Sequence, residues 1–352
     1  MDLLAHLKTL CAVPGISGYE DRARAAIAKA WKPLVSELHT DNLGSLWAAK
    51  HGNGQGQRPK LMLAAHIDAI GLMVTNIEAE FLRVTSVGGI DARVMPGQPV
   101  TVHGRRDLPG TVVAPASFLL PKANREGATP VTELLVDCGL PAKQLAQQVQ
   151  LGDVISFAQP PVELNGGLLA ANRLDNRASV AAVTACLEEL QTTPHLWDVV
   201  AVATVQEETR LAGAMTSAFA LQPQLAVVID VTWGVGPGAR EHSDRMFELG
   251  KGPVLGFGPN IHPKVHAALK ATAERLEMSY SLEPMATHSG TDAFAIQVAR
   301  EGIPTAVVGI ALRNMHTPVE VVSVKDVQRT GRLLAEFIGS LTADLSKFNL
   351  EE

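Results

Sequence analysis

Three segments of the chain are almost continuously apolar, and a histidine or an acidic residue follows each of them closely. They are 60–65 (KLMLAA), 225–229 (LAVVI) and 305–310 (TAVVGI). A strand that is apolar on both faces is typical of the middle of a sheet that helices cover on both sides. The sequence therefore predicts an α/β protein with a mixed sheet. Helices are expected at 2–11, 20–38, 177–190, 212–219, 264–276 and 324–341, and further strands at 45–49 and 198–204.

The composition changes between residues 71 and 162. Short alternating segments follow one another there, and Gly and Pro punctuate them, as in M-P-G and L-P-G. This pattern is typical of a small β-barrel or sandwich. We therefore expect an inserted β domain at 71–162, between two parts of one α/β domain at 1–70 and 163–352. The strands expected in the insertion are 72–77, 81–87, 99–102, 111–114 and 154–157.

Composition excludes several classes of function. The formal net charge is −6 over 352 residues, so no basic surface exists to neutralise nucleic-acid phosphates. Aromatic residues make up only 4%, which argues against stacking platforms for sugars or bases. The three cysteines have no CxxC spacing, and we find neither a signal peptide nor a membrane-spanning run. We expect a soluble cytoplasmic protein with no nucleic-acid or membrane partner.

Histidines and acidic residues lie at the predicted ends of the buried strands, where an α/β sheet forms its ligand crevice. His66 and Asp68 follow the first run and point the same way on an extended chain, so that Asp68 can accept from the imidazole N–H that faces away from a metal. Asp175 precedes a helix. A strand-end histidine satisfied by an acid, and an Asp helix cap, are the alternatives.

The other candidates follow three further strands. Glu207 and Glu208 come after 198–204, and two adjacent carboxylates repel each other unless cations compensate them. Asp230 ends the run LAVVID, and His316 follows TAVVGI. A solvated acidic loop and a turn histidine are the alternatives here. Taken together, the segments supply two histidines, three carboxylates and one extra glutamate, which is the stoichiometry of a two-metal site with a shared carboxylate.

Six motifs occur in a fixed order: H-x-D, L-D-N-R, Q-E-E, V-I-D, G-T-D-A and M-H-T-P-V-E. In this order they resemble the tetrahedral (TET) or glutamyl aminopeptidase family of dinuclear metallopeptidases. The resemblance covers nearly the whole chain, including PGISGYE near the start, GGIDARVMPGQPV in the insertion and GIPTAVVGI near the end.

The resemblance implies a ligand set and a mechanism. Asp175 would bridge two divalent ions, zinc or cobalt, with His66 and Asp230 completing one shell and Glu208 and His316 the other. Glu207 would be the general acid/base for a metal-bridging water that cuts N-terminal residues from peptides, and Asp68 would orient His66. The inserted domain would be a β-barrel that forms dimers, and the dimers would assemble into a hollow dodecamer.

The sequence departs from the family pattern in two places beside these motifs. Residues 209–214 read T-R-L-A-G-A where the family has V-G-L-R-G-A, and 311–315 read A-L-R-N-M where it has P-x-R-Y-M. No ligand is lost, but substrate preference is left open. His288 is expected near the site but not as a ligand.

Other functions remain as alternatives. A related dinuclear amidohydrolase would act on N-acylated amino acids or as a carboxypeptidase, with Arg313 as one residue that could bind a substrate carboxylate. A non-catalytic assembly protein with this fold would have lost a ligand or Glu207, and neither is lost. An endoglucanase would need two carboxylates without histidine ligands, and usually aromatic sugar platforms.

Overall fold

The apolar runs form the centre of a large mixed sheet in the computed structural model, which describes residues 1–119, 127–236, 239 and 245–350. Strands β12, β3, β13 and β16 are neighbours in the sheet and run parallel. The carboxyl ends of parallel strands meet at one edge of a sheet. The side chains that follow these four strands are therefore brought to the same edge.

The remaining strands extend the sheet on both sides, mostly by antiparallel pairing, and the predicted mixed α/β architecture is confirmed. The order is β1-β2-β12-β3-β13-β16-β17-β11-β10, and β14 and β15 pair beside β16. The strand bounds are β1 (Glu37–Thr40), β2 (Leu46–Lys50), β3 (Lys60–His66), β10 (Val162–Leu164), β11 (Leu168–Ala171), β12 (Asp198–Thr204), β13 (Leu225–Trp233), β14 (Val254–Phe257), β15 (Ser281–Pro284), β16 (Thr305–Arg313) and β17 (Glu320–Ser323).

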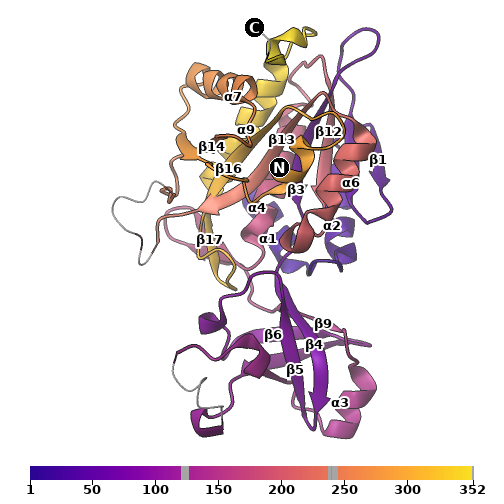
Figure 1. The fold of residues 1–352 in the computed structure, drawn as a ribbon, viewed down its shortest axis with the longest axis vertical. Coiled ribbons are helices and arrows are strands. Elements are labelled where there is room, and N and C mark those ends of the chain that lie inside the picture. Colours follow the sequence, from indigo (N-terminus) through magenta and orange to yellow (C-terminus); the bar gives the residue numbers. More distant parts are fainter. Residues whose placement is uncertain (120–126, 237–238, 240–244, 351–352) are drawn as a thin grey trace.

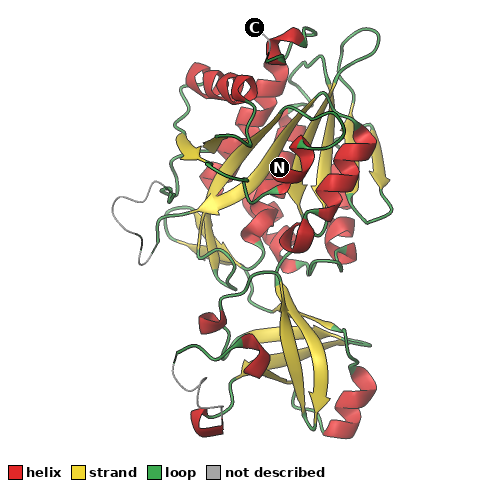
Figure 2. Ribbon diagram, in the orientation of Figure 1, coloured by secondary structure: helices red, strands yellow, loops and turns green. Residues whose placement is uncertain are grey.

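Helices cover both faces of this sheet (Figures 1 and 2). Helices α1, α4 and α9 pack together on one face, and α6 and α8 pack together on the other. Helix α4 is buried along almost its whole length because it lies between the sheet and the helices outside it. The helix bounds are α1 (Leu3–Ala12), α2 (Asp21–Trp31), α4 (Leu174–Glu189), α5 (Glu207–Arg210), α6 (Ala212–Leu221), α7 (Pro263–Arg275), α8 (Asp292–Gln297) and α9 (Val324–Ser340).

The helix predicted at 20–38 is too long. Helix α2 ends at Trp31, two residues before Pro33. Proline has no N–H to donate and its ring clashes with the preceding turn, so a helix rarely continues through it. The residues beyond it form the edge strand β1 instead.

The inserted segment forms a closed barrel, which Figure 1 shows as a separate body below the sheet. Its strands are all antiparallel, in the order β4-β5-β8-β7-β6-β9, so the barrel prediction is confirmed. Leu72, Val102, Val136 and Ile155 belong to its apolar core. The bounds are β4 (Gly71–Glu78), β5 (Phe81–Val87), β6 (Pro99–His103), β7 (Asp107–Val113), β8 (Leu135–Asp137), β9 (Val154–Phe157) and α3 (Ala142–Gln148).

Short 3-10 turns complete the described structure, at Ala92–Val94, Ser117–Leu119, Val131–Glu133 and Ser346–Phe348. Within the part of the chain that the structure describes, no helix has the length and apolar character needed to cross a membrane.

Candidate metal centre

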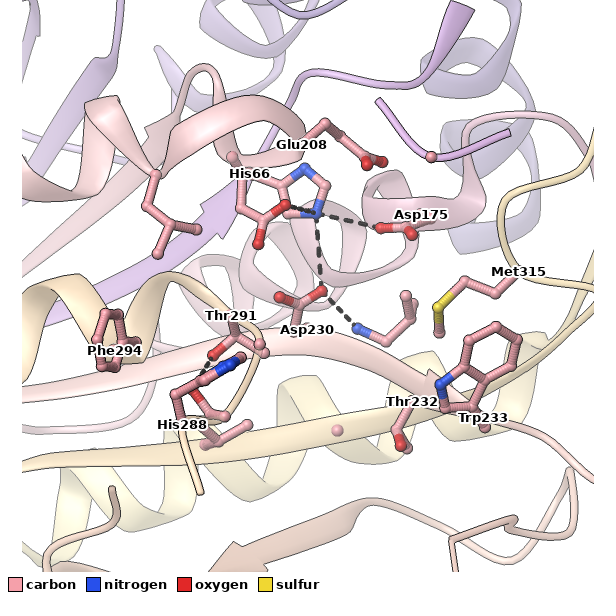
Figure 3. A pocket seen from close by; sticks show the side chains of 18 of the residues that line it. His66, Asp175, Glu208, Asp230, Thr232, Trp233, His288, Thr291, Phe294 and Met315 are labelled. Atoms are coloured by element: carbon pink, nitrogen blue, oxygen red, sulfur yellow. Dashed lines mark hydrogen bonds and ion pairs between the residues drawn. The ribbon is translucent and has the colours of Figure 1, made fainter. Parts of the chain in front are cut away.

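The five predicted ligands and Glu207 meet at the carboxyl edge of the parallel strands (Figure 3). His66 is the last residue of β3, and Thr204 at the end of β12 lies beside it in register. Glu207 and Glu208 open the short helix α5 that follows β12. The sheet therefore brings together side chains that are far apart in the sequence.

These side chains form two groups, each with ligand atoms within 4.8 Å of one another. In one group, His66 Nε2 lies 3.7 Å from Asp230 Oδ1 and 3.8 Å from Glu207 Oε2. In the other, His316 Nε2 lies 3.7 Å from Glu208 Oε2. Imidazole nitrogens and carboxylate oxygens are the donors that zinc and other first-row divalent ions accept in hydrolases.

Asp175 belongs to the second group and also faces the first. Its Oδ1 is 3.1 Å from His66 Nε2, and its Oδ2 is 3.4 Å from His316 Nε2. Asp175 is the second residue of helix α4, but its backbone does not have helical dihedral angles. Its carboxylate faces the two imidazole rings. One carboxylate thus directs an oxygen to each group, which is the arrangement that a shared ligand requires.

Asp68 fixes the backbone of the glutamate pair. Its Oδ1 accepts from the N–H of Glu207 and its Oδ2 from the N–H of Glu208, both at 3.0 Å. The side chain is fully buried, and Oδ1 lies 3.5 Å from His66 Nδ1. The backbone oxygen of Asp68 is closer to that nitrogen, at 3.2 Å. Asp68 therefore supports three members of the site at once.

Glu320 likewise accepts backbone hydrogen bonds from two further residues of the site, and the sequence analysis did not identify it. Its Oε2 accepts from the N–H of Asp175 at 3.1 Å, and its Oε1 from the N–H of His316 at 3.2 Å. Only 2% of the side chain is exposed. The available signal was its place at the end of M-H-T-P-V-E, four residues after the histidine.

Burial and neighbouring charges shift the pKa values of the carboxylates at this site. Burial raises the pKa of Glu207 to about 9, against the favourable charge of His66. Burial also raises the pKa of Glu208, and the neighbouring charge of Asp175 raises it further. Burial alone would raise the pKa of Asp175, but the contacts with His316 and His66 hold that pKa below its ordinary value.

A second observation fits bound cations. Glu208 Oε1 is buried and has no hydrogen-bond partner among the described residues. A buried carboxylate oxygen without a donor is costly unless a cation or water completes its shell. Divalent ions would satisfy this atom and compensate the crowded negative charge. The donor set and its unmet charge therefore fit a metal centre.

A cavity of about 550 Å³ opens onto the two groups. Its lining includes apolar side chains, among them Trp233, Met315 and Phe294, which Figure 3 shows around the cluster. His288 lines the cavity and packs against Phe294 with ring centroids 5.6 Å apart, so it lies near the site as predicted.

The two departures from the family pattern lie in different surroundings. Thr209 and Leu211 line the cavity. Ala311 and Leu312 are fully buried in the core, and Arg313 donates from Nε to the Val235 carbonyl oxygen at 2.6 Å. Arg313 is not among the described residues that line the cavity, so its contacts do not support a role in binding a substrate carboxylate.

Comparison with known proteins agrees with this geometry. The family model described as M42 glutamyl aminopeptidase matches residues 44–333. The lysyl aminopeptidase of Pyrococcus furiosus is 33% identical over 343 residues, which cover 95% of this chain and 96% of that protein. The structure of an aminopeptidase from the archaeon Desulfurococcus kamchatkensis is 31% identical and superposes with a TM-score of 0.89, covering 97% of this chain and 96% of that one.

A further solved structure is similar over the same length. The TET1 peptidase of Pyrococcus horikoshii, which can assemble into a tetrahedron or a large octahedral shell, is 26% identical with a TM-score of 0.82. The alignment covers 97% of this chain and 100% of that one. Both the family match and the full-length relatives lead to the same assignment. The chain belongs to the M42 glutamyl aminopeptidase family and is a metal-dependent aminopeptidase.

Proposed function

We propose that the chain is a dinuclear aminopeptidase that removes N-terminal residues from peptides with two divalent ions, zinc or cobalt. The observation that carries this proposal is the position of Asp175, whose two oxygens face His66 and His316 respectively. Asp175 would bridge the ions. His66 and Asp230 would complete one shell, and Glu208 and His316 the other.

The other catalytic steps are assigned to residues of the chain. When bound, the two ions would lower the pKa of a water molecule and polarise the scissile carbonyl. Glu207 takes the proton of the attacking water and delivers it to the leaving amine. Burial raises the pKa of Glu207, and the positive charge of bound ions would lower it again, so that the carboxylate could accept this proton. Asp68 keeps the Glu207 and Glu208 backbone in place for this transfer.

We also propose that the protein self-associates in the cytoplasm, through dimers and on to a dodecamer. The assembly of the related TET1 peptidase supports this proposal. The barrel at 71–162 would be the dimerisation domain, and its strands β4 to β9 form a body of their own outside the sheet. The free cysteines Cys11, Cys138 and Cys186 are consistent with a reducing compartment.

The proposed activity is tested with pairs of peptides that differ only at the amino terminus. The protein is stripped with a chelator, reloaded with zinc or cobalt, and incubated with each peptide in its free and N-acetylated form. We expect release of the first residue from the free peptide only, detected by mass spectrometry. The stripped protein should be inactive, and activity should rise until two equivalents of metal are bound.

Two results would contradict parts of this proposal. Cleavage of only the acetylated peptides would identify a deacylase and overturn the aminopeptidase assignment of this site. Saturation of activity at one equivalent would leave the aminopeptidase in place but remove the second ion from the mechanism. Heat-treated protein is the control for hydrolysis by free metal.

Glu320→Gln is expected to weaken metal binding by roughly 10- to 100-fold, the range found when a group that holds a ligand is removed. An amide has one acceptor oxygen, so the N–H groups of Asp175 and His316 can no longer both be satisfied. The measurement is the metal dissociation constant from competition with a chromogenic chelator.

The matched control for this variant is Glu336→Gln, which removes a carboxylate that pairs with Arg275 on the surface of α9. It should bind metal as the wild type does. Equal metal affinity in E320Q and the wild type would refute the role given to Glu320. Circular dichroism of both variants separates loss of ligand positioning from loss of fold.

A further inference from the structure

Glu283 differs from the other acidic residues of the cavity. Among the described residues five carboxylates line it, and four of them, those of Asp175, Glu207, Glu208 and Asp230, belong to the two candidate metal groups. Glu283, on the short strand β15, is the fifth. Its charge is therefore not committed to a metal.

Glu283 reaches the cavity beside the strand that carries Asp230. Its Oε1 accepts from the Thr232 hydroxyl at 2.9 Å. Thr232 follows Asp230 by two residues on β13, so the two side chains point to the same face of the sheet. Figure 3 shows Thr232 below the cluster, next to Trp233. The Glu283 carboxylate thus lies one side chain beyond the proposed metal ligands.

No cationic side chain among the described residues forms an ion pair with Glu283. Arg210 lines the same cavity but donates to the amide oxygen of Gln206, with Nη2 at 3.2 Å. His288 packs its ring against Phe294. Burial removes part of the hydration of the Glu283 carboxylate and raises its pKa. A cation that binds beside it would stabilise the charged form of this carboxylate.

The surroundings of Glu283 suit a long aliphatic stem. Trp233, Met285 and Met315 line the cavity with apolar surface. Gly309 on β16 also lines it, and a methyl group at that position would come within 3.0 Å of Thr232 Cγ2. The absence of a side chain there leaves space beside Thr232. A side chain with an apolar stem and a charged end matches this combination.

We propose that Glu283 binds the cationic side chain of the first substrate residue, so that the enzyme prefers peptides that begin with lysine or arginine. This inference rests on the proposed aminopeptidase function, because it takes the first residue to lie beside the metal centre. A lysine stem packs on Trp233 and the methionines, and its ammonium group meets the Glu283 carboxylate. An acidic first residue is repelled by the same charge.

The test compares lysine with norleucine, which has the same four-carbon stem without the ammonium group. We expect kcat/KM for lysyl 4-nitroanilide to exceed that for norleucyl 4-nitroanilide by roughly 10- to 100-fold in the metal-loaded wild type. In Glu283→Gln the lysyl value should fall by about the same factor, while the norleucyl value changes less than about 3-fold. The glutamine side chain can still accept the hydrogen bond from the Thr232 hydroxyl, so we expect the variant to keep the wild-type fold.

Glu301→Gln is the matched control, because it removes the same charge from an exposed position outside the cavity. It should keep the wild-type preference. Calorimetric titration of each protein with free L-lysine and L-norleucine gives a second measurement that does not depend on turnover, and only the lysine affinity should fall in E283Q.

The outcomes separate this inference from the proposed function. Equal or weaker use of lysine relative to norleucine in the wild type would overturn the role of Glu283 while leaving an aminopeptidase. An equal loss for both substrates in E283Q would overturn it as well. If free amino termini are not cleaved at all, the proposed function fails, and the calorimetric comparison still decides whether Glu283 binds the ammonium group.

Discussion

Replacement of Glu207 by glutamine is expected to lower kcat by roughly 10²- to 10⁴-fold while the fold and the metal content stay unchanged. Glutamine has nearly the same shape and keeps the N–H that donates to Asp68. It cannot take a proton from water at neutral pH, so the proton transfer between water and the leaving amine is lost. Steady-state kinetics and metal analysis of the same preparation make the measurement.

The adjacent residue provides the comparison. Glu208→Gln makes the same chemical change one position along the chain, where the N–H also donates to Asp68. We propose Glu208 as a ligand, so this variant should lose bound metal as well as activity. Near-normal turnover of E207Q, or loss of metal from E207Q and not from E208Q, would show that the roles of the two glutamates are assigned wrongly.

Asp175→Asn is expected to lower kcat/KM by on the order of 10³-fold or more and to reduce the metal content below two ions per chain. The amide replaces one of the two oxygens that face His66 and His316. An amide nitrogen cannot coordinate a metal, so one ion loses its bridging ligand and the negative charge between the ions decreases. Metal stoichiometry by plasma mass spectrometry is the direct measurement.

Asp198→Asn serves as the control for this substitution. Asp198 opens β12 at the opposite edge of the sheet, where it pairs with Arg58. Its variant should retain two ions and full activity. If D175N also retained both ions, Asp175 would not be the bridging ligand, and the two groups would have to be regarded as separate sites.

The fold was predictable where burial dominates local preference. The segments that form β3, β13 and β16 are apolar on both faces. Only a strand that is covered on both faces can keep all of these apolar side chains away from water. Strands β8, β14 and β15 gave no such signal. Strand β8 has three residues, and β14 and β15 have four each, so their pairing depends on neighbours far away in the sequence.

The grouping of the proposed ligands was predictable because all of them except Asp175 lie at or after the end of a segment that the sequence predicts as a strand. His66 ends β3, Asp230 lies within β13, and the pair Glu207–Glu208 follows β12; the parallel order of those strands gathers them at one edge. Glu320 and Glu283 could not be assigned in this way. Their roles depend on which N–H or hydroxyl lies opposite, and that is decided by pairings across the sheet rather than by neighbouring residues.

The origin of the ligands in distant strands also has a consequence for biosynthesis. His66 emerges early in translation, whereas His316 follows β16 near the end of the chain. Bringing such distant segments together has a loop-closure cost that only the completed sheet can offset. A nascent chain that has not yet exposed His316 lacks one member of the second candidate group. On the ribosome, full loading of the proposed metal centre would therefore await the last elements of the sheet, and the unfinished chain would not hold the complete centre.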